Sequence, residues 1–187
     1  MTNSKKIAIK KLTILAFCIV LNIVGSNLAL MLRLPVYLDS IGTILGAALF
    51  GPVWGMLAGG ITDVIMGLTT DLTSLYYIPV ALVLGCLAGF LYRKISPDRF
   101  SKVWVVALLI SLPGTILSTA ITYFAFGGVT SSGSSIIVQL LFGMGLSKFW
   151  AIFIVQVLTD LLDRLISVYI VAVLFHSYKP LKKLSQQ

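Results

Sequence analysis

The residues best suited to chemistry lie late in the chain, in an otherwise apolar run that contains Gln156, Asp160, Asp163 and Arg164. Carboxylates and a guanidinium at this spacing fit a catalytic motif, a proton relay, a ligand site or an internal ion pair. On a helix these side chains share one face about 100° wide. Asp160 and Arg164 are four residues apart in the favourable acid-before-base order. The pattern therefore predicts a structural clamp between Asp160 and Arg164, with Gln156 as the better candidate for direct ligand contact.

The chain lacks the residue sets that most enzymes need. The Asp160-x-x-Asp163 spacing resembles the start of the CDP-alcohol phosphotransferase signature, but an arginine follows directly where that signature needs a glycine. There is no GxxxxGK[ST] loop for ATP and no HExxH motif. The single histidine, His176, falls near the end of the last apolar segment, and Cys18 and Cys86 lack metal-ligand spacing. We expect no enzymatic activity, no cofactor and no metal site.

The elements that position these residues are membrane helices. Of the 187 residues, 58% are hydrophobic and 11% are charged, which is too much apolar surface for a soluble domain of this size. Apolar segments separated by polar or Pro/Gly breaks predict an all-α integral membrane fold, a single domain over residues 1–187 with six transmembrane helices. The predicted helices span approximately residues 12–32, 37–50, 52–68, 75–93, 102–126 and 148–175.

The distribution of basic residues predicts the orientation of the bundle. Most Lys and Arg residues fall on one side of the predicted helices, and only Arg33 and Lys148 fall in loops on the other. By the positive-inside rule, both termini should be cytoplasmic. The net charge of +8 then reflects membrane topology and contact with anionic lipid, and we expect no nucleic-acid partner. The basic residues of the predicted cytoplasmic side are Lys5, Lys6, Lys10, Lys11, Arg93, Lys94, Arg99, Lys102, Lys179, Lys182 and Lys183.

With this orientation, polar residues concentrate in the outer halves of the helices and in the outer loops. Polar side chains are costly in lipid and normally face a bundle interior or a watery cavity. The asymmetry predicts a pocket that is open to the outside and closed by an apolar cytoplasmic floor, although any single Ser or Thr can equally join two helices. Asn27 and Asp160 are among the expected binding residues on this argument.

Gly51, Gly55 and Gly59 recur every four residues on one face of the third predicted helix. Small residues at this spacing let two backbones approach closely. The face can serve internal packing or docking against a partner's helices, and we include the three glycines among the candidate docking residues.

Five stretches resemble the substrate-binding S components of energy-coupling factor (ECF) vitamin transporters. The resemblance covers nearly the whole chain and includes the Gly-Pro break between the second and third helices. The stretches are Leu34–Thr43, Gly51–Gly59, Thr70–Tyr76, Gly127–Ser135 and Gln156–Arg164.

The resemblance implies a six-helix subunit that captures a small-molecule vitamin outside the cell and works with a membrane T subunit and two cytoplasmic ATPase subunits. It also implies a multi-pass location in the cytoplasmic membrane of a bacterium. In the family, an Ala-x-x-x-Ala motif on the first helix contacts the T subunit, and Ala16 with Val20 is the nearest match here. Mapping the family's binding regions gives Arg33, Asp39, Asp71, Tyr76, Tyr77, Tyr123, Ser132, Gln139, Trp150 and Gln156 as further ligand-binding candidates.

The expected ligand is a small ring-containing vitamin or precursor. A pyridoxine or hydroxymethylpyrimidine type is the first hypothesis, and riboflavin, pantothenate and cobalamin types stay open. Tyr76, Tyr77 and Trp150 would stack on a flat ring or, alternatively, form an interfacial aromatic belt. In the connection from Gly127 to Ser147, the Gly/Ser-rich part Gly127–Ser135 is either a lid or a surface loop, and the apolar part Ile136–Met144 is expected to fold back onto the bundle. The alternative function is a ligand-sensing membrane module for a signalling partner.

Overall fold

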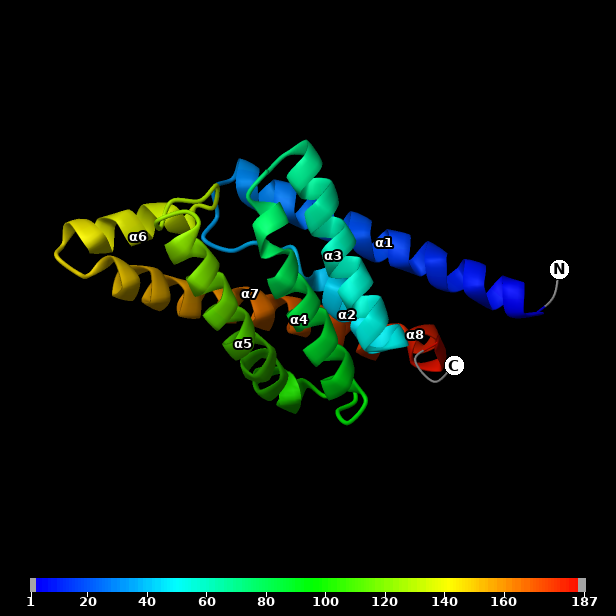
Figure 1. The fold of residues 1–187 in the computed structure, drawn as a ribbon. Helices are drawn as coiled ribbons and strands as arrows, with labels where there is room; N and C mark the ends of the chain where they lie inside the picture. Colours follow the sequence, from blue (N-terminus) through cyan, green and yellow to red (C-terminus); the bar gives the residue numbers. More distant parts are fainter. Residues whose placement is uncertain (1–2, 185–187) are drawn as a thin grey trace.

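The computed structural model describes residues 3–184, and every regular element in that range is a helix (Figure 1). The all-α prediction is confirmed. The elements are α1 (Asn3–Met31), α2 (Ile41–Phe50), α3 (Pro52–Thr69), α4 (Ser74–Tyr92), the 3-10 turn η1 (Phe100–Lys102), α5 (Val103–Phe124), α6 (Ser134–Gly143), α7 (Lys148–Ser177) and α8 (Lys179–Leu184).

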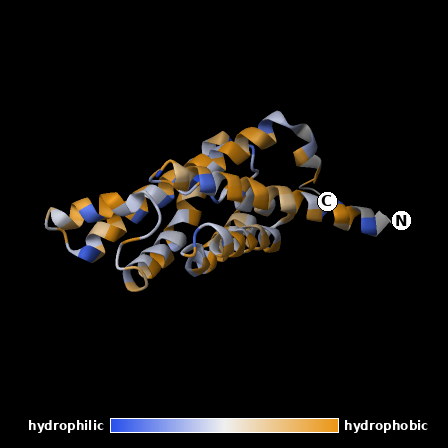
Figure 2. Ribbon diagram, turned by 90° about the horizontal axis from the view of Figure 1, so that it is seen from above, coloured by the Kyte–Doolittle hydropathy of each residue, from blue (hydrophilic) through white to orange (hydrophobic). Residues whose placement is uncertain are grey.

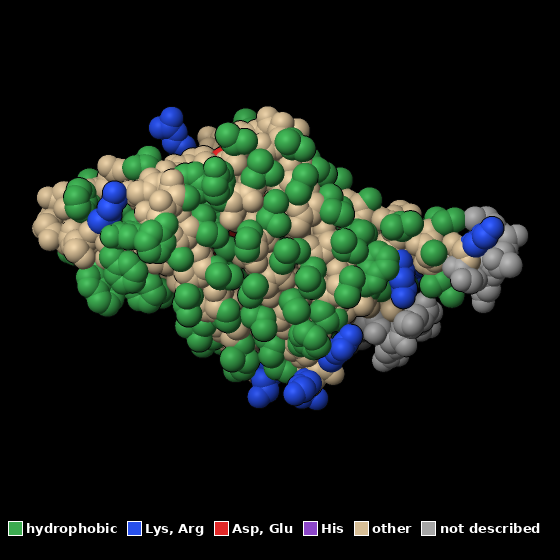
Figure 3. Space-filling model, in the orientation of Figure 1, with side chains coloured by type: hydrophobic (Ala, Val, Ile, Leu, Met, Phe, Trp, Pro, Cys, Tyr) green, Lys and Arg blue, Asp and Glu red, His purple; other side chains and the backbone are tan. Residues whose placement is uncertain are grey.

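Four helical segments of the described chain are long and apolar enough to cross a membrane: Ile7–Met31, Pro52–Thr69, Ser74–Tyr92 and Phe100–Phe124. Hydrophobic residues run along nearly every helix (Figure 2). Hydrophobic side chains also cover the central face of the molecule, while Lys and Arg lie toward its periphery (Figure 3). These features make the chain a multi-pass membrane protein. The 30-residue α7 is long enough to span as well, but it carries three charged side chains in its middle, and α2 has only 10 residues.

The connection between α1 and α2 is longer than predicted, because α2 begins at Ile41 rather than at residue 37. Two non-glycine residues in this connection, Arg33 and Leu38, have φ of 51° and 54°, which a helix does not allow. At its other end α2 stops at Gly51, whose φ is 92°, and Pro52 then starts α3 at a position that needs no N–H. The tight break predicted at Gly51-Pro52 is therefore present.

The first three helices meet at Asn22, a fully buried residue of α1. Its amide nitrogen donates to Thr43 Oγ1 at 2.9 Å and to Thr62 Oγ1 at 3.2 Å. Its amide oxygen accepts the backbone N–H of Gly42 at 2.7 Å, which satisfies a donor at the start of α2. One side chain thus joins α1 to both α2 and α3.

The glycine face of α3 is used inside the molecule. A Cβ added to Gly55 would lie 2.7 Å from the carbonyl oxygen of Gly85 in α4, and one added to Gly59 would lie 3.1 Å from Ala81 Cβ. Both glycines are buried, so the prediction that this face docks a partner is wrong for Gly55 and Gly59: α4 already covers it. The third glycine, Gly51, lies beside the Arg93 side chain: a Cβ added there would be 3.6 Å from Arg93 Nη2.

The other two docking candidates stay accessible. Ala16 and Val20 are both exposed on α1, where no described helix covers them. Whether a partner binds them is untested, and they remain predictions.

An apolar core fills one half of the bundle. It is built from most of α2, the C-terminal parts of α4 and α7 and the N-terminal part of α5, with contributions from α1 and α3. Ile44, Leu84, Ile110 and Phe175 are almost completely buried in it. A second, smaller cluster centred on Ile152 packs α6 against α7. The second half of the connection 127–147 therefore packs onto the bundle as predicted, and it does so as helix α6, which was not predicted.

Candidate functional site

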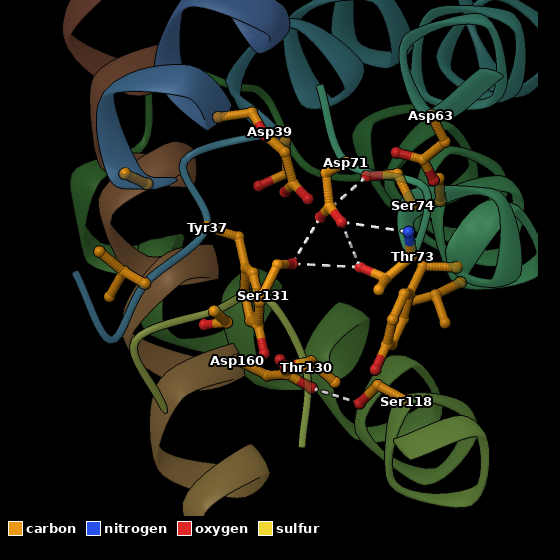
Figure 4. Close-up of a pocket in the computed structure, with 18 of the residues that line it drawn as sticks. Tyr37, Asp39, Asp63, Asp71, Thr73, Ser74, Ser118, Thr130, Ser131 and Asp160 are labelled. Carbon is orange, nitrogen blue, oxygen red and sulfur yellow. Dashed lines mark hydrogen bonds between the residues drawn. The ribbon is translucent and has the colours of Figure 1, made fainter. Parts of the chain in front are cut away.

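A cavity of about 80 Å³ lies among α1, the α1–α2 connection, α3, α4, α5 and α7. This is several times the volume that one water molecule needs. Leu84 belongs both to the cavity wall and to the apolar core, so the core closes one end of the cavity. Figure 4 shows four carboxylates around the space. The polar or aromatic side chains lining it are Ser26, Tyr37, Asp39, Ser40, Thr43, Asp63, Asp71, Thr73, Ser74, Tyr77, Ser118, Thr130, Ser131, Ser132, Asp160 and Arg164.

The ion pair of α7 joins neighbouring residues. Arg164 Nη1 donates to the carboxylate of Asp163 and, at 2.8 Å, to Ser40 Oγ. It also lies 3.6 Å from Asp39 Oδ1. The predicted clamp between Asp160 and Arg164 is therefore wrong, because the α1–α2 connection brings other acceptors to the guanidinium.

Asp163 holds the α1–α2 connection in place. Its Oδ1 accepts the backbone N–H groups of Tyr37 at 3.2 Å and Leu38 at 2.6 Å, and its Oδ2 accepts the Ser40 hydroxyl at 2.9 Å. The residue is fully buried. Such a carboxylate is stable only when it is both paired and hydrogen-bonded, as it is here. The connection thus depends on α7 for its conformation.

Asp160 faces the cavity and is bonded to α5. Its Oδ2 accepts the hydroxyls of Thr115 at 3.0 Å and Ser118 at 2.9 Å. Its Oδ1 accepts no hydrogen bond from the described residues. One oxygen of this buried carboxylate is therefore free to accept a donor in the cavity.

Asp71 links the α3–α4 turn to the α5–α6 connection. Its Oδ2 accepts the Ser131 hydroxyl at 2.7 Å, and its Oδ1 accepts the backbone N–H and hydroxyl of Thr73 at 3.1 and 2.7 Å (Figure 4). Ser131 and Thr73 also lie within 3.1 Å of each other. This contact, which we call the Asp71–Ser131 latch, joins two connections across one wall of the cavity.

Two tyrosines provide flat walls and are connected behind the cavity. Tyr37 Oη donates to Gln156 Oε1 at 3.2 Å, and Gln156 Nε2 donates to Thr122 Oγ1 at 2.8 Å. Thr122 Oγ1 also lies 2.6 Å from Tyr77 Oη. Gln156 is buried and does not line the cavity. In this structure it orients the tyrosines instead of reaching the cavity itself.

The structure gathers some of the predicted binding residues and separates others. Asp39, Asp71, Tyr77, Ser132 and Asp160 line one cavity. The other candidates do not line it: Asn27, Arg33, Tyr76, Tyr123, Gln139, Trp150 and Gln156.

The aromatic candidates outside the cavity contact other aromatic side chains. Tyr76 is 54% exposed and packs edge-on against Phe126, and Trp150, also 54% exposed, packs against Phe149. Tyr123 contacts Phe149 as well. The exposed positions of Tyr76 and Trp150 are typical of aromatic residues at a membrane–water interface, which was the alternative to a role in stacking on the ligand.

The remaining candidates lie elsewhere on the bundle. Arg33 and Gln139 are exposed, and Asn27 donates to the Ile23 carbonyl at 2.8 Å. Among residues that sequence reasoning left out of the site, Tyr37 and Asp63 line the cavity. Tyr37 could have been found from the sequence, because it lies two residues before Asp39 in the stretch Leu34–Thr43 that resembles the S components. Asp63 could have been found as well, because a charged residue within an apolar helix is usually functional.

Comparison with known proteins gives one match. A family model described as ECF transporter, substrate-specific component, matches residues 10–175. No curated protein and no solved structure matches the chain.

Proposed function

Since the chain belongs to the family of substrate-specific components of ECF transporters, we propose that it captures a vitamin or vitamin precursor outside a bacterial cell and delivers it inward. In this role it works with a membrane T subunit and two cytoplasmic ATPase subunits. The chain itself catalyses no reaction, and ATP hydrolysis belongs to the partner subunits.

The observation that carries the proposal is the polar cavity inside an apolar bundle. Its wall combines carboxylates and hydroxyls with the rings of Tyr37 and Tyr77, while the apolar core closes one end. Small-molecule sites combine concave shape, apolar walls and a few convergent polar groups in this way. The volume of about 80 Å³ favours a single-ring ligand of the pyridoxine or hydroxymethylpyrimidine type over a macrocycle such as cobalamin.

We also propose six membrane-spanning segments, with α2 and α7 added to the four apolar spans, and both termini in the cytoplasm. The buried position of α2 and the inward-facing charges of α7 support their place in the bundle, since neighbouring helices cover them. Most basic side chains in Figure 3 lie over the start of α1 and the α4–α5 connection, as the positive-inside rule requires.

Purification of the tagged chain from its native membrane tests the transport role. We expect the T subunit and two ATPase subunits to copurify, and the complex in proteoliposomes to accumulate a vitamin only when ATP is supplied. Isothermal titration with a vitamin panel should give at least one ligand bound at micromolar affinity or tighter. Absence of the partner subunits from the purified material would contradict the proposal.

Labelling of cysteine variants in intact cells tests the topology. In a Cys86→Ala background, Ser147→Cys should react with a membrane-impermeant maleimide, because Ser147 is exposed before α7 on the proposed outer side. Ser96→Cys, in the exposed α4–α5 connection, should react only after the cells are opened. The reverse pattern would overturn the proposed orientation.

A further inference from the structure

Acidic side chains outnumber basic ones around the cavity. Four aspartates line it, and Arg164 is the one basic side chain among the described residues of its wall. The charge of Arg164 is already matched by Asp163, with which it forms a buried ion pair. The acidic groups that face the cavity are therefore not matched by basic ones.

Asp63 of α3 is the carboxylate whose surroundings are incomplete. Its side chain lines the cavity although the residue is only 7% exposed. Within the described residues it makes no hydrogen bond and no ion pair. Figure 4 shows its carboxylate beside the same space as Asp71 and Ser74. A buried carboxylate without a donor is costly, so this position calls for a donor from a bound molecule.

Two other carboxylates of the cavity keep room for a donor. Asp39 lies 3.6 Å from Arg164, but its side chain is 33% exposed, and Oδ1 of Asp160 accepts no hydrogen bond from the described residues. By contrast, Asp71 is satisfied by Ser131 and Thr73. The free acceptors lie on α3, on the α1–α2 connection and on α7, so they surround the cavity from different elements.

We infer that the transported molecule is an organic cation: a compact ring that carries a protonated amine directed at Asp63. The inference rests on the proposed function and adds the charge class of its substrate. A cationic N–H donor supplies both the hydrogen bond and the charge that this wall lacks. The aromatic side chains of Tyr37 and Tyr77 line the same cavity, and aromatic rings are favourable neighbours for a cation. A bare metal ion is disfavoured, since no cluster of three metal-ligating side chains occurs among residues 3–184.

Matched ligand pairs test the inference on the purified full-length chain in lipid nanodiscs. One pair is pyridoxamine and pyridoxine, which differ by an aminomethyl group in place of a hydroxymethyl group. The second pair is the aminomethyl and hydroxymethyl forms of 4-amino-2-methylpyrimidine, and pantothenate serves as an anion. At pH 7 we expect the aminomethyl member of at least one pair to bind ten times more tightly than its hydroxymethyl partner, and pantothenate not to bind.

Substitution of the carboxylate assigns the preference to its residue. Asp63→Asn keeps the shape of the side chain and should bring the affinity ratio within the pair close to one. Asp98→Asn removes one negative charge from the α4–α5 connection, outside the cavity, and should leave the ratio unchanged. The comparison within each pair uses the unaltered chain, so it stands even if Asp63→Asn does not fold.

The outcomes separate this inference from the proposed function. Equal or tighter binding of a hydroxymethyl compound or of pantothenate, or binding of no aminomethyl compound, would overturn the cation assignment. A neutral or anionic vitamin bound tightly would leave the transport role standing. The transport role itself fails only through the copurification and uptake measurements.

Discussion

Removal of the guanidinium of Arg164 should destabilise the protein strongly. In Arg164→Met, the fully buried Asp163 keeps the hydrogen bonds from Tyr37, Leu38 and Ser40 but loses the one close positive charge that the described residues give it. Breaking a buried ion pair in this way costs about 3–5 kcal/mol. For a chain of this length each kcal/mol lowers Tm by about 2–4 °C, so we expect a decrease of roughly 6–20 °C.

A double variant distinguishes a lost ion pair from lost packing. Asp163→Asn combined with Arg164→Met removes both charges, while the Asn oxygen can still accept the two backbone N–H groups. We expect the double variant to recover about 2 kcal/mol relative to Arg164→Met alone, which is the pairwise term of a double-mutant cycle. Thermal unfolding in detergent, followed by tryptophan fluorescence, measures all the variants under one condition.

Asp160→Asn is the matched control. The Asn oxygen can accept the hydroxyls of Thr115 and Ser118, which both bond one oxygen of the native carboxylate. We expect a loss below about 1 kcal/mol, since no ion pair is broken. The reasoning is refuted if Arg164→Met shifts Tm by less than about 2 °C, or if Asp160→Asn costs as much as Arg164→Met.

Three further substitutions test other contacts. Gly85→Leu forces a side chain into the backbone of α3 and should lower the free energy of unfolding by about 1–3 kcal/mol, seen as a lower Tm. The control Gly143→Ala, which has nothing within 4 Å of its added Cβ, should leave Tm unchanged. Asn22→Leu leaves the buried N–H of Gly42 without its acceptor and should lower the free energy of unfolding by about 2 kcal/mol in the same assay. An unchanged Tm would show that Asn22 does not join the first three helices. Ser131→Ala opens the Asp71–Ser131 latch and should speed hydrogen–deuterium exchange of residues 127–133 about tenfold, since an exposed hydrogen bond to a charged group contributes about 1.5 kcal/mol. Unaltered exchange would show that the latch does not hold this segment.

The sequence was sufficient for the features that depend on local pattern. Apolar periodicity predicted the helices, and the Gly51-Pro52 pair predicted the break between α2 and α3 because both residues act through their own backbone geometry. The concentration of polar residues in the outer halves also pointed to a cavity that gathers Asp39, Asp71 and Asp160. Hydropathy alone carries this information, since polar groups in a membrane bundle must face inward.

Features set by tertiary contacts could not be read in the same way. The spacing rule pairs Asp160 with Arg164, but the choice between neighbouring carboxylates is made by the α1–α2 connection, which lies more than 120 residues away in sequence and donates to Asp163. Likewise, the sequence pattern predicted that Tyr37 begins the second helix, but Tyr37 lies in the α1–α2 connection. Tyr76 and Trp150 have the residue type of a stacking wall, yet only their neighbours in space decide that they face outward.

The contact between Gly55 and Gly85 has a mechanical consequence. Because no side chain separates the backbones of α3 and α4, the two helices have little room to slide or tilt against each other and should move as one rigid body. Asp63 and Tyr77, which project from this pair, then keep a fixed separation while a molecule enters. Any widening of the cavity must then come from its other walls, including residues 125–133, which are held by the Asp71–Ser131 latch, by the backbone bond from Gly128 to Thr122 and by Phe126 against Tyr76 and Tyr77. The α3–α4 pair therefore serves as a fixed template against which an entering molecule is fitted.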